Sequence, residues 1–217
     1  KITQAVRDEG GVICMQILHA GRYGYHPLVV SASKHKSPIS PFKPRALSNW
    51  GVERQISAFV NCARLARDAG YHGVEVMGSE GYLINQFLAA RTNHRDDDWG
   101  GSFENRTRFL RELVDGIRSE VPGLDIGVRL SAFDWMPFKP GVDKVGVQDQ
   151  DSAFGPQYPY AFGGDGTGIG IDLRETHQFL DLLETLNILD GFDLQKLEHN
   201  GADAIHLVVE AMKLGLA

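Results

Sequence analysis

Short apolar runs alternate with amphipathic helical segments along this chain, and this alternation limits the possible folds more than any other feature. The β-branched run at 73–77 and the nearly continuous apolar run at 12–18 predict two buried strands, and the run at 124–130 predicts a third strand. Between them, the segments around 56–63 and 109–117 repeat apolar residues at helical spacing. The connections are long enough for parallel crossovers. The sequence therefore predicts an α/β fold with a parallel sheet, either doubly wound or a (β/α)₈ barrel.

Polar side chains gather where these strands end. Gln16 and His19 lie in and just after the first strand, and Glu80 and Tyr82 follow the second. Arg129 lies inside the third, in the segment VRLS. Barrel and open-sheet enzymes place their catalytic groups at the carboxyl ends of parallel strands, so an enzyme is the leading interpretation.

Two of these residues have more than one interpretation. An arginine in an apolar strand is costly unless it is paired. Arg129 is therefore either satisfied by a structural carboxylate or placed beside a negatively polarised ligand atom. Tyr82 is either a catalytic group or a packed aromatic residue whose hydroxyl reaches solvent.

Composition and motifs argue against several other functions. A formal net charge of -6 without a basic cluster gives no reason to expect nucleic acid or an anionic membrane as partner. The glycine-rich run at 163–170 does not fit the dinucleotide-binding spacing, and neither H-E-x-x-H nor G-x-S-x-G occurs. Cys14 and Cys62 form no metal or disulfide motif. No metal site is expected.

The sequence also predicts a cytoplasmic protein. No apolar run approaches the roughly 20 residues that span a bilayer, and the first residues lack a signal-peptide pattern. Two widely separated cysteines fit a reducing compartment.

A segment at 136–171, rich in Gly, Pro and aromatic residues, interrupts the alternation. It has no helical face and leaves the carboxyl end of a strand, so we expect a long loop over the active-site face, either functional or a floppy insertion. Asp172 and Glu175 then predict a capping-box-like start of a further helix.

Three segments carry a resemblance to a known family: QILHAGR (16–22), GVEVMGSEGYLINQFLAARTNHRDDDWGGSFENRTRF (73–109) and VRLS (128–131). Over about 1–186 the chain resembles the old yellow enzyme family of FMN-dependent ene-reductases. It is most similar to the branch that holds 2,4-dienoyl-CoA reductases and NADH:flavin oxidoreductases. The resemblance implies part of a (β/α)₈ barrel, about three strands with their helices, with FMN across the carboxyl ends of the strands.

The resemblance also implies roles for individual residues. Gln16 would bind the pyrimidine edge of the flavin, and Arg129 would lie near N1 and O2, where a cation stabilises negative charge. Most members use a His/Asn or His/His pair to hold the substrate carbonyl, at the positions of Met77 and Glu80. Here Tyr82 would be the proton donor, and Glu80 would orient or tune it.

The resemblance also implies that His19, Arg22 and Arg91 bind the substrate. The implied reaction passes hydride from NADH or NADPH through FMN to an activated alkene, such as an enoyl or dienoyl thioester or an enone. The alternative is a truncated or chimeric chain that is not catalytic and binds no flavin.

The chain departs from the family at both ends. The family has about two strands before 16–22, and further strands with phosphate-binding loops after about residue 186. The segment 187–217 instead has one helical apolar face and resembles a scaffold segment of γ-glutamyltranspeptidase. We therefore expect a barrel fragment at 1–186, a helical tail of foreign character at 187–217, and possible self-association through open sheet edges. An iron–sulfur centre is not expected.

Overall fold

A three-stranded parallel sheet forms the centre of the protein. The computed structural model describes residues 1–37, 39–134, 138–143, 145–148, 162–165 and 170–185. The strands of the sheet lie in the order β1-β4-β5 and are all parallel. Their bounds are Cys14–Ile17 for β1, Gly73–Gly78 for β4 and Asp125–Leu130 for β5. The predicted α/β class with a parallel sheet is confirmed.

Two long helices connect these strands. They are α2 (Asn49–Asp68) and α4 (Phe103–Glu120). Each begins at a serine whose hydroxyl oxygen accepts a hydrogen bond from a backbone N–H three residues on: Ser48 from Gly51 and Ser102 from Asn105. The two helices are the predicted crossovers.

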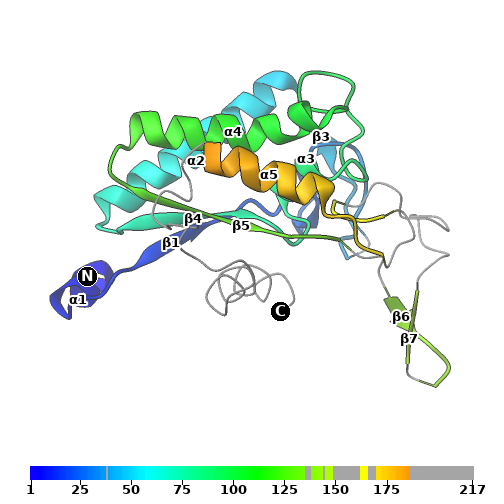
Figure 1. Cartoon of the computed structure of the whole chain (residues 1–217), viewed down its shortest axis with the longest axis horizontal. Helices are drawn as coiled ribbons and strands as arrows, with labels where there is room; N and C mark the ends of the chain where they lie inside the picture. Colours follow the sequence, from blue (N-terminus) through cyan, green and yellow to red (C-terminus); the bar gives the residue numbers. More distant parts are fainter. Residues whose placement is uncertain (38, 135–137, 144, 149–161, 166–169, 186–217) are drawn as a thin grey trace.

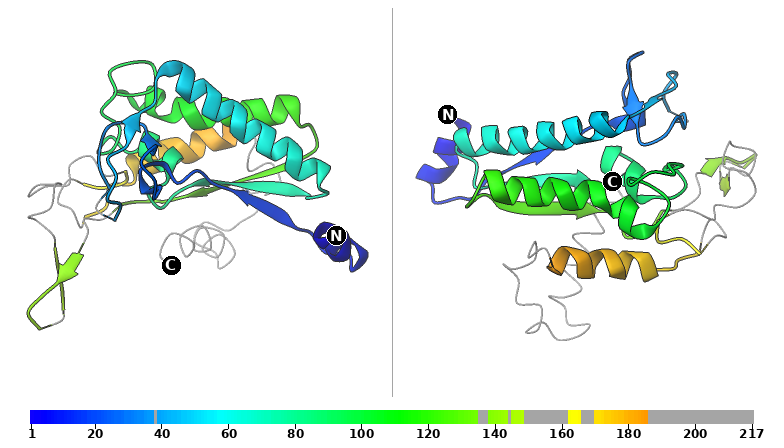
Figure 2. Two further views of the ribbon diagram at one scale, coloured as in Figure 1. Left: turned by 180° about the vertical axis from the view of Figure 1, so that it is seen from behind. Right: turned by 90° about the horizontal axis from the view of Figure 1, so that it is seen from above.

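The helices cover one face of the sheet. Figure 1 shows α2, α4 and the later helix α5 (Arg174–Thr185) on the same side, and Figure 2 shows the three side by side from above. A doubly wound sheet carries helices on both faces, whereas a barrel carries all of them outside. Among the described residues the arrangement is therefore that of a barrel wall.

An aromatic cluster fills the space between helices and sheet. Phe87 stacks on Phe109 with ring centroids 4.7 Å apart, and Phe59 meets Phe109 edge to face at 6.3 Å. All three rings are buried. Removing a ring of this kind typically costs about 3–5 kcal/mol, so this cluster anchors α2, α3 (Leu83–Leu88) and α4 to one another.

The first strand differs from the prediction of a buried strand. In β4 every residue except the half-buried Glu75 is buried, whereas in β1 only Ile17 is buried and Cys14 and Gln16 are exposed. The reason is the one-sided cover: in the part of the chain that the structure describes, no helix lies on the opposite face. Alternate side chains of β1 and β5 therefore face solvent.

The segment at 136–171 also differs in its described part. It contains a short antiparallel hairpin, formed by β6 (Phe138–Pro140) and β7 (Gly146–Gln148), where a loop without regular structure was expected. Figure 1 shows this hairpin projecting away from the sheet, and its exposed Val142 and Val145 lie between its strands in the sequence. Residues 149–161 and 166–169 lie outside the described residues.

The start of α5 is not a capping box. The Asp172 carboxylate accepts a hydrogen bond from the Arg174 backbone N–H at 3.2 Å, but Glu175 does not reach back to it. Glu175 instead forms an ion pair with the buried guanidinium of Arg106 on α4. For the Glu175 carboxylate, the buried Arg106 guanidinium is a stronger hydrogen-bond partner than a backbone N–H at the helix start. The ion pair fixes α5 against α4.

The remaining elements are short. They are α1 (Ile2–Asp8), the 3₁₀ turn η1 (Gly21–Tyr23), and the parallel pair β2 (Val30–Ser31) and β3 (Arg45–Ala46). Among the described helices, none combines the length and apolar character needed to cross a membrane. The predicted helical tail lies outside the described residues.

Candidate functional site

The carboxyl ends of the three strands are joined by hydrogen bonds. The backbone N–H of Leu83, at the start of α3, donates to the carbonyl oxygen of His19 beyond β1 at 3.0 Å. The backbone N–H of Glu80 donates to the hydroxyl oxygen of Ser131 beyond β5, also at 3.0 Å. The segment after β4 is therefore tied to both neighbouring strand ends, which brings the site residues predicted at the strand ends to one edge of the sheet.

A strained turn carries the catalytic candidates. Glu80 has a φ of 59° and Gly81 a φ of 73°. Left-handed backbone is unfavourable for a residue with a side chain, so the surroundings must hold Glu80 in place. The Asn85 side-chain oxygen does so by accepting from the Gly81 N–H at 3.0 Å. A Cβ on Gly81 would lie 2.2 Å from the Tyr23 hydroxyl oxygen, so only glycine fits there.

Tyr82 follows this turn directly and occupies the N-cap position of α3. Its ring is half-buried and meets the ring of Tyr23 edge to face, with centroids 5.7 Å apart. The contact fixes the ring from one side. Both interpretations of Tyr82, as proton donor and as packed aromatic, are compatible with this position.

Arg129 is paired with carboxylates. Its Nε donates to Glu75 Oε1 at 2.8 Å and its Nη2 to Glu75 Oε2 at 3.3 Å, while Nη1 lies 3.8 Å from Glu80 Oε1. Gln16 Nε2 also donates to Glu75 Oε1, at 2.6 Å. The structural-carboxylate interpretation of Arg129 is therefore present in the structure. Gln16 and Arg129, predicted from separate strands, meet on one acceptor.

His19 is a neutral hydrogen-bond acceptor. Burial lowers the pKa of its imidazole, and its Nδ1 accepts from the Gly21 backbone N–H at 2.9 Å. Arg22 is only 4% exposed, and its guanidinium lies 5.5 Å from the centre of the Tyr23 ring. These contacts do not test whether His19 and Arg22 bind substrate, so both roles stay predictions.

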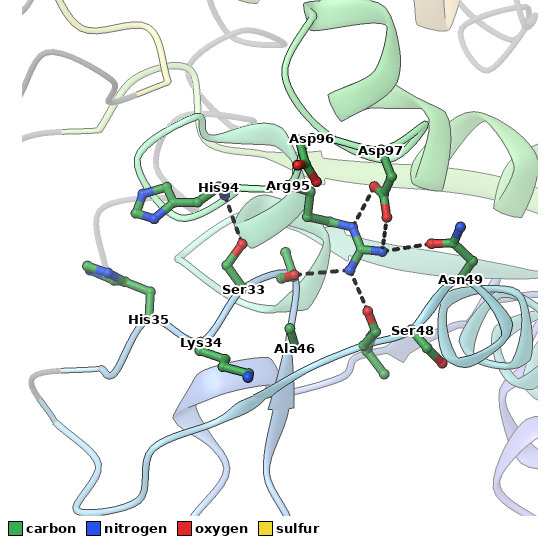
Figure 3. A pocket seen from close by; sticks show the side chains of 12 residues that line it. Ser33, Lys34, His35, Ala46, Ser48, Asn49, His94, Arg95, Asp96 and Asp97 are labelled. Atoms are coloured by element: carbon green, nitrogen blue, oxygen red, sulfur yellow. Dashed lines mark hydrogen bonds and ion pairs between the residues drawn. The ribbon is translucent and has the colours of Figure 1, made fainter.

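Figure 3 shows a separate pocket of about 650 Å³, which His94 lines and which Arg91, the third residue predicted to bind substrate, does not line. The Arg91 carbonyl oxygen bonds to the His94 ring at 2.8 Å, and the His94 ring meets that of His35 at 5.5 Å. Burial, followed by the charges of Arg22 and Arg91, lowers the pKa of His35 to about 4. Gln16, Glu80, Tyr82 and Arg129 do not line this pocket.

The pocket wall is held by one arginine. Arg95 donates to Asp97 through Nε at 2.9 Å and Nη2 at 2.6 Å, to the Ala32 carbonyl at 3.2 Å, and to the Asn49 side chain at 2.9 Å (Figure 3). These Arg95 hydrogen bonds lower the pKa of Asp97. Asp97, the middle residue of the Asp96–Asp98 run, is therefore used structurally, and within the described residues no group of His, Cys, Asp and Glu could hold a metal ion.

Two residues of the site were missed in the sequence. Glu75 stands in the apolar run GVEVMG, where a lone carboxylate is itself a signal. Gln86 is fully buried: its Oε1 accepts from the Ser31 hydroxyl at 2.8 Å and the Arg22 N–H at 3.1 Å, and its Nε2 donates to the Gly81 carbonyl at 2.6 Å. Nothing in the helical pattern of 83–88 distinguishes this glutamine from a surface one.

Comparison with known proteins identifies the family. Residues 1–151 match the NADH:flavin oxidoreductase / NADH oxidase family, which is most of the chain. The chain belongs to this family. An NADPH dehydrogenase of Geobacillus sp. (strain WCH70) is 37% identical over 138 residues, which are 63% of this chain and 40% of that protein. A 12-oxophytodienoate reductase 1 of Oryza sativa subsp. japonica is 38% identical over 144 residues, 61% of this chain and 38% of that protein.

A solved structure supports the same family. Morphinone reductase superposes with a TM-score of 0.57 and 32% sequence identity, over 60% of this chain and 41% of its own. The resemblance to the old yellow enzyme family is thereby confirmed, and the fold is part of a (β/α)₈ barrel. This chain spans about 40% of the length of these relatives. The resemblance of the tail to γ-glutamyltranspeptidase falls outside both the matched and the described residues.

Proposed function

We propose that this chain carries the flavin-binding and proton-donating segment of an FMN-dependent ene-reductase that uses NADH or NADPH. The observation that carries the proposal is that Gln16, Arg129 and Glu80 are joined across three adjacent parallel strands, and that Tyr82 follows Glu80 in the turn after β4. Membership of the flavin oxidoreductase family supports the same assignment.

The donors on the sheet fit the pyrimidine half of FMN. Gln16 offers an amide and Arg129 a guanidinium, both hydrogen-bonding groups on the uncovered face, and the flavin edge presents carbonyl oxygens and ring nitrogens. When bound, FMN would supply hydride transfer between a reduced nicotinamide and an alkene. Arg129 would place positive charge beside the flavin, where electron density increases on reduction.

The turn after β4 would supply the proton. Tyr82 lies at the start of α3, after the strand between those that carry Gln16 and Arg129. Its phenol would protonate the alkene carbon that does not receive hydride. Glu80, held by its N–H on Ser131, would orient the phenol or the substrate. We propose His19, Arg22 and Arg91 as residues of the substrate side.

The substrate class is proposed from the motif after β4. Met77 and Glu80 stand where most family members hold a substrate carbonyl with a His/Asn or His/His pair, so we propose an enoyl or dienoyl thioester or an enone. The substrate names of the relatives above, 12-oxophytodienoate and morphinone, describe those proteins. A cytoplasmic location and the division into 1–186 and 187–217 are likewise proposals.

Comparing the two half-reactions of the purified chain with those of Tyr82→Phe tests the proposal. We expect the variant to bind FMN and to be bleached by NADPH as the wild type is, but to lose at least about tenfold in the rate of alkene reduction. Tyr71→Phe, which precedes the amino end of β4, is the matched control. Equal alkene rates for Tyr82→Phe and wild type would exclude Tyr82 as proton donor.

The second candidate function is a non-catalytic fragment. The exposed side chains of Cys14 and Gln16 on β1 favour it, because in the described residues this strand has one sheet neighbour and one uncovered face. Such an edge pairs readily with another chain, so we propose self-association as its consequence. Sedimentation velocity of the chain with and without FMN separates the two: a flavin enzyme retains the cofactor, whereas the fragment associates and stays colourless.

A further inference from the structure

Glu75 is the centre of the polar network on the uncovered face of the sheet. It lies in the middle of β4, in register with Gln16 on β1 and with Gly127 on β5. Its carboxylate accepts one hydrogen bond from Gln16 and two from Arg129, at 2.6, 2.8 and 3.3 Å. One side chain on the central strand therefore holds the donors of both neighbouring strands.

The sequence of β5 makes this contact possible. Side chains two residues apart on a strand share a face, so Arg129 stands on the same face as Gly127 and one step further along. Gly127 leaves the space beside Glu75 open: a Cβ there would meet only the Val74 carbonyl oxygen, at 3.8 Å. The Arg129 guanidinium reaches the Glu75 carboxylate along this shared face of the sheet.

The pairing fixes both the orientation and the charge of the site. Glu75 takes the Nε and Nη2 side of the guanidinium, which turns Nη1 towards Glu80. The Arg129 side chain is 15% exposed and that of Glu75 30%, so solvent screens the pair only partly. Among the described residues, the Glu75 and Glu80 carboxylates lie around the one Arg129 guanidinium, so their negative charge opposes the positive charge that Arg129 provides.

We propose that Glu75 is the positioning residue of the flavin site: it sets the directions of the Gln16 and Arg129 donors, and its charge weakens the preference of the site for reduced flavin. This inference rests on the proposed function, since it assigns a role towards FMN. Replacing Glu75 by Gln keeps the length of the side chain and one acceptor oxygen but removes the negative charge.

A double-mutant cycle on the cofactor-free chain tests the positioning. Urea unfolding of Glu75→Gln, Arg129→Gln and the double variant should give a coupling of about tenfold in the unfolding constant, because the pair is close and partly desolvated. The same cycle with Glu80→Gln should give a smaller coupling, since its oxygen lies 3.8 Å from Nη1. No coupling between Glu75 and Arg129 would overturn the inference.

FMN titration and potentiometry test the charge effect. In Glu75→Gln we expect the flavin reduction equilibrium to shift about tenfold towards the reduced form, which is about 30 mV for a two-electron couple. Glu53→Gln, on the exposed side of α2, should leave the potential unchanged.

The outcomes distinguish the two claims. A wild type that binds FMN, with an unchanged affinity and potential in Glu75→Gln, overturns the role of Glu75 and leaves the proposed function intact. A wild type that binds no FMN overturns the proposed function, and the flavin role of Glu75 with it, whatever the coupling to Arg129.

Discussion

Gln86→Leu should destabilise the chain and loosen the strained turn that carries Glu80 and Tyr82. Gln86 is fully buried and joins three separate segments through its amide: η1, β2 and the turn after β4. Leucine has a similar volume and fits the helix, so the change removes hydrogen bonds without opening a large cavity.

The magnitude follows from the groups left without a partner. The substitution leaves three groups without a hydrogen-bond partner: the Arg22 N–H, the Ser31 hydroxyl and the Gly81 carbonyl. In the wild type each of them is bonded to Gln86 within 3.1 Å. A buried polar group that loses its partner costs about 1–3 kcal/mol. Some relaxation and the lower desolvation cost of leucine offset part of this sum, so we expect a net loss of about 3 kcal/mol.

Urea unfolding followed by tryptophan fluorescence measures the loss, and amide hydrogen exchange locates it. We expect the backbone N–H groups of Tyr82 and Leu83 to lose protection more than those of α4, because they belong to the turn that Gln86 holds. Gln4→Leu is the matched control: Gln4 is exposed and bonds only to Asp8 on the same helix, so it should change stability by less than about 0.5 kcal/mol. A loss in Gln86→Leu as small as in the control would refute this reasoning.

Three further predictions follow from single contacts. Gly81→Ala should unfold at a lower urea concentration and bind FMN more weakly, because its φ is 73° and a Cβ would lie 2.2 Å from the Tyr23 hydroxyl oxygen. Glu175→Gln should raise hydrogen exchange in α5 while leaving that of β4 unchanged, because it breaks the ion pair with Arg106; equal exchange in α5 would show that the pair does not hold the helix. Burial and nearby guanidinium groups lower the pKa of His35 to about 4, so the unfolded chain binds the proton first and stability should fall as pH drops from about 6.5 towards 4. His35→Gln should flatten this dependence, and an unchanged slope would contradict it.

The sequence predicted the strands and crossover helices because their patterns are local. The period of apolar residues in α2 and α4, and the β-branched run of β4, are present in the chain itself. The buried character predicted for β1 was wrong because burial depends on what covers the opposite face. Periodicity within 12–18 does not contain that information.

Among the site residues, those at strand ends could be predicted and those that hold them could not. Gln16 and Arg129 stand out as polar side chains in apolar strands. Their common acceptor, Glu75, is fixed by the register of three strands. Glu175 was assigned to a helix cap because its partner Arg106 is 69 residues away in the sequence. Long-range pairs of this kind are set by packing.

Equilibrium binding of FMN to the purified full chain tests the central claim most directly. If the donors on β1 and β5 form the flavin site, titration should give a dissociation constant in the micromolar range or tighter, and the bound flavin should lose its absorbance on addition of NADPH. Arg129→Gln should weaken this binding, while Glu53→Gln should not. A wild-type chain that retains no FMN after gel filtration at saturating cofactor would contradict the account.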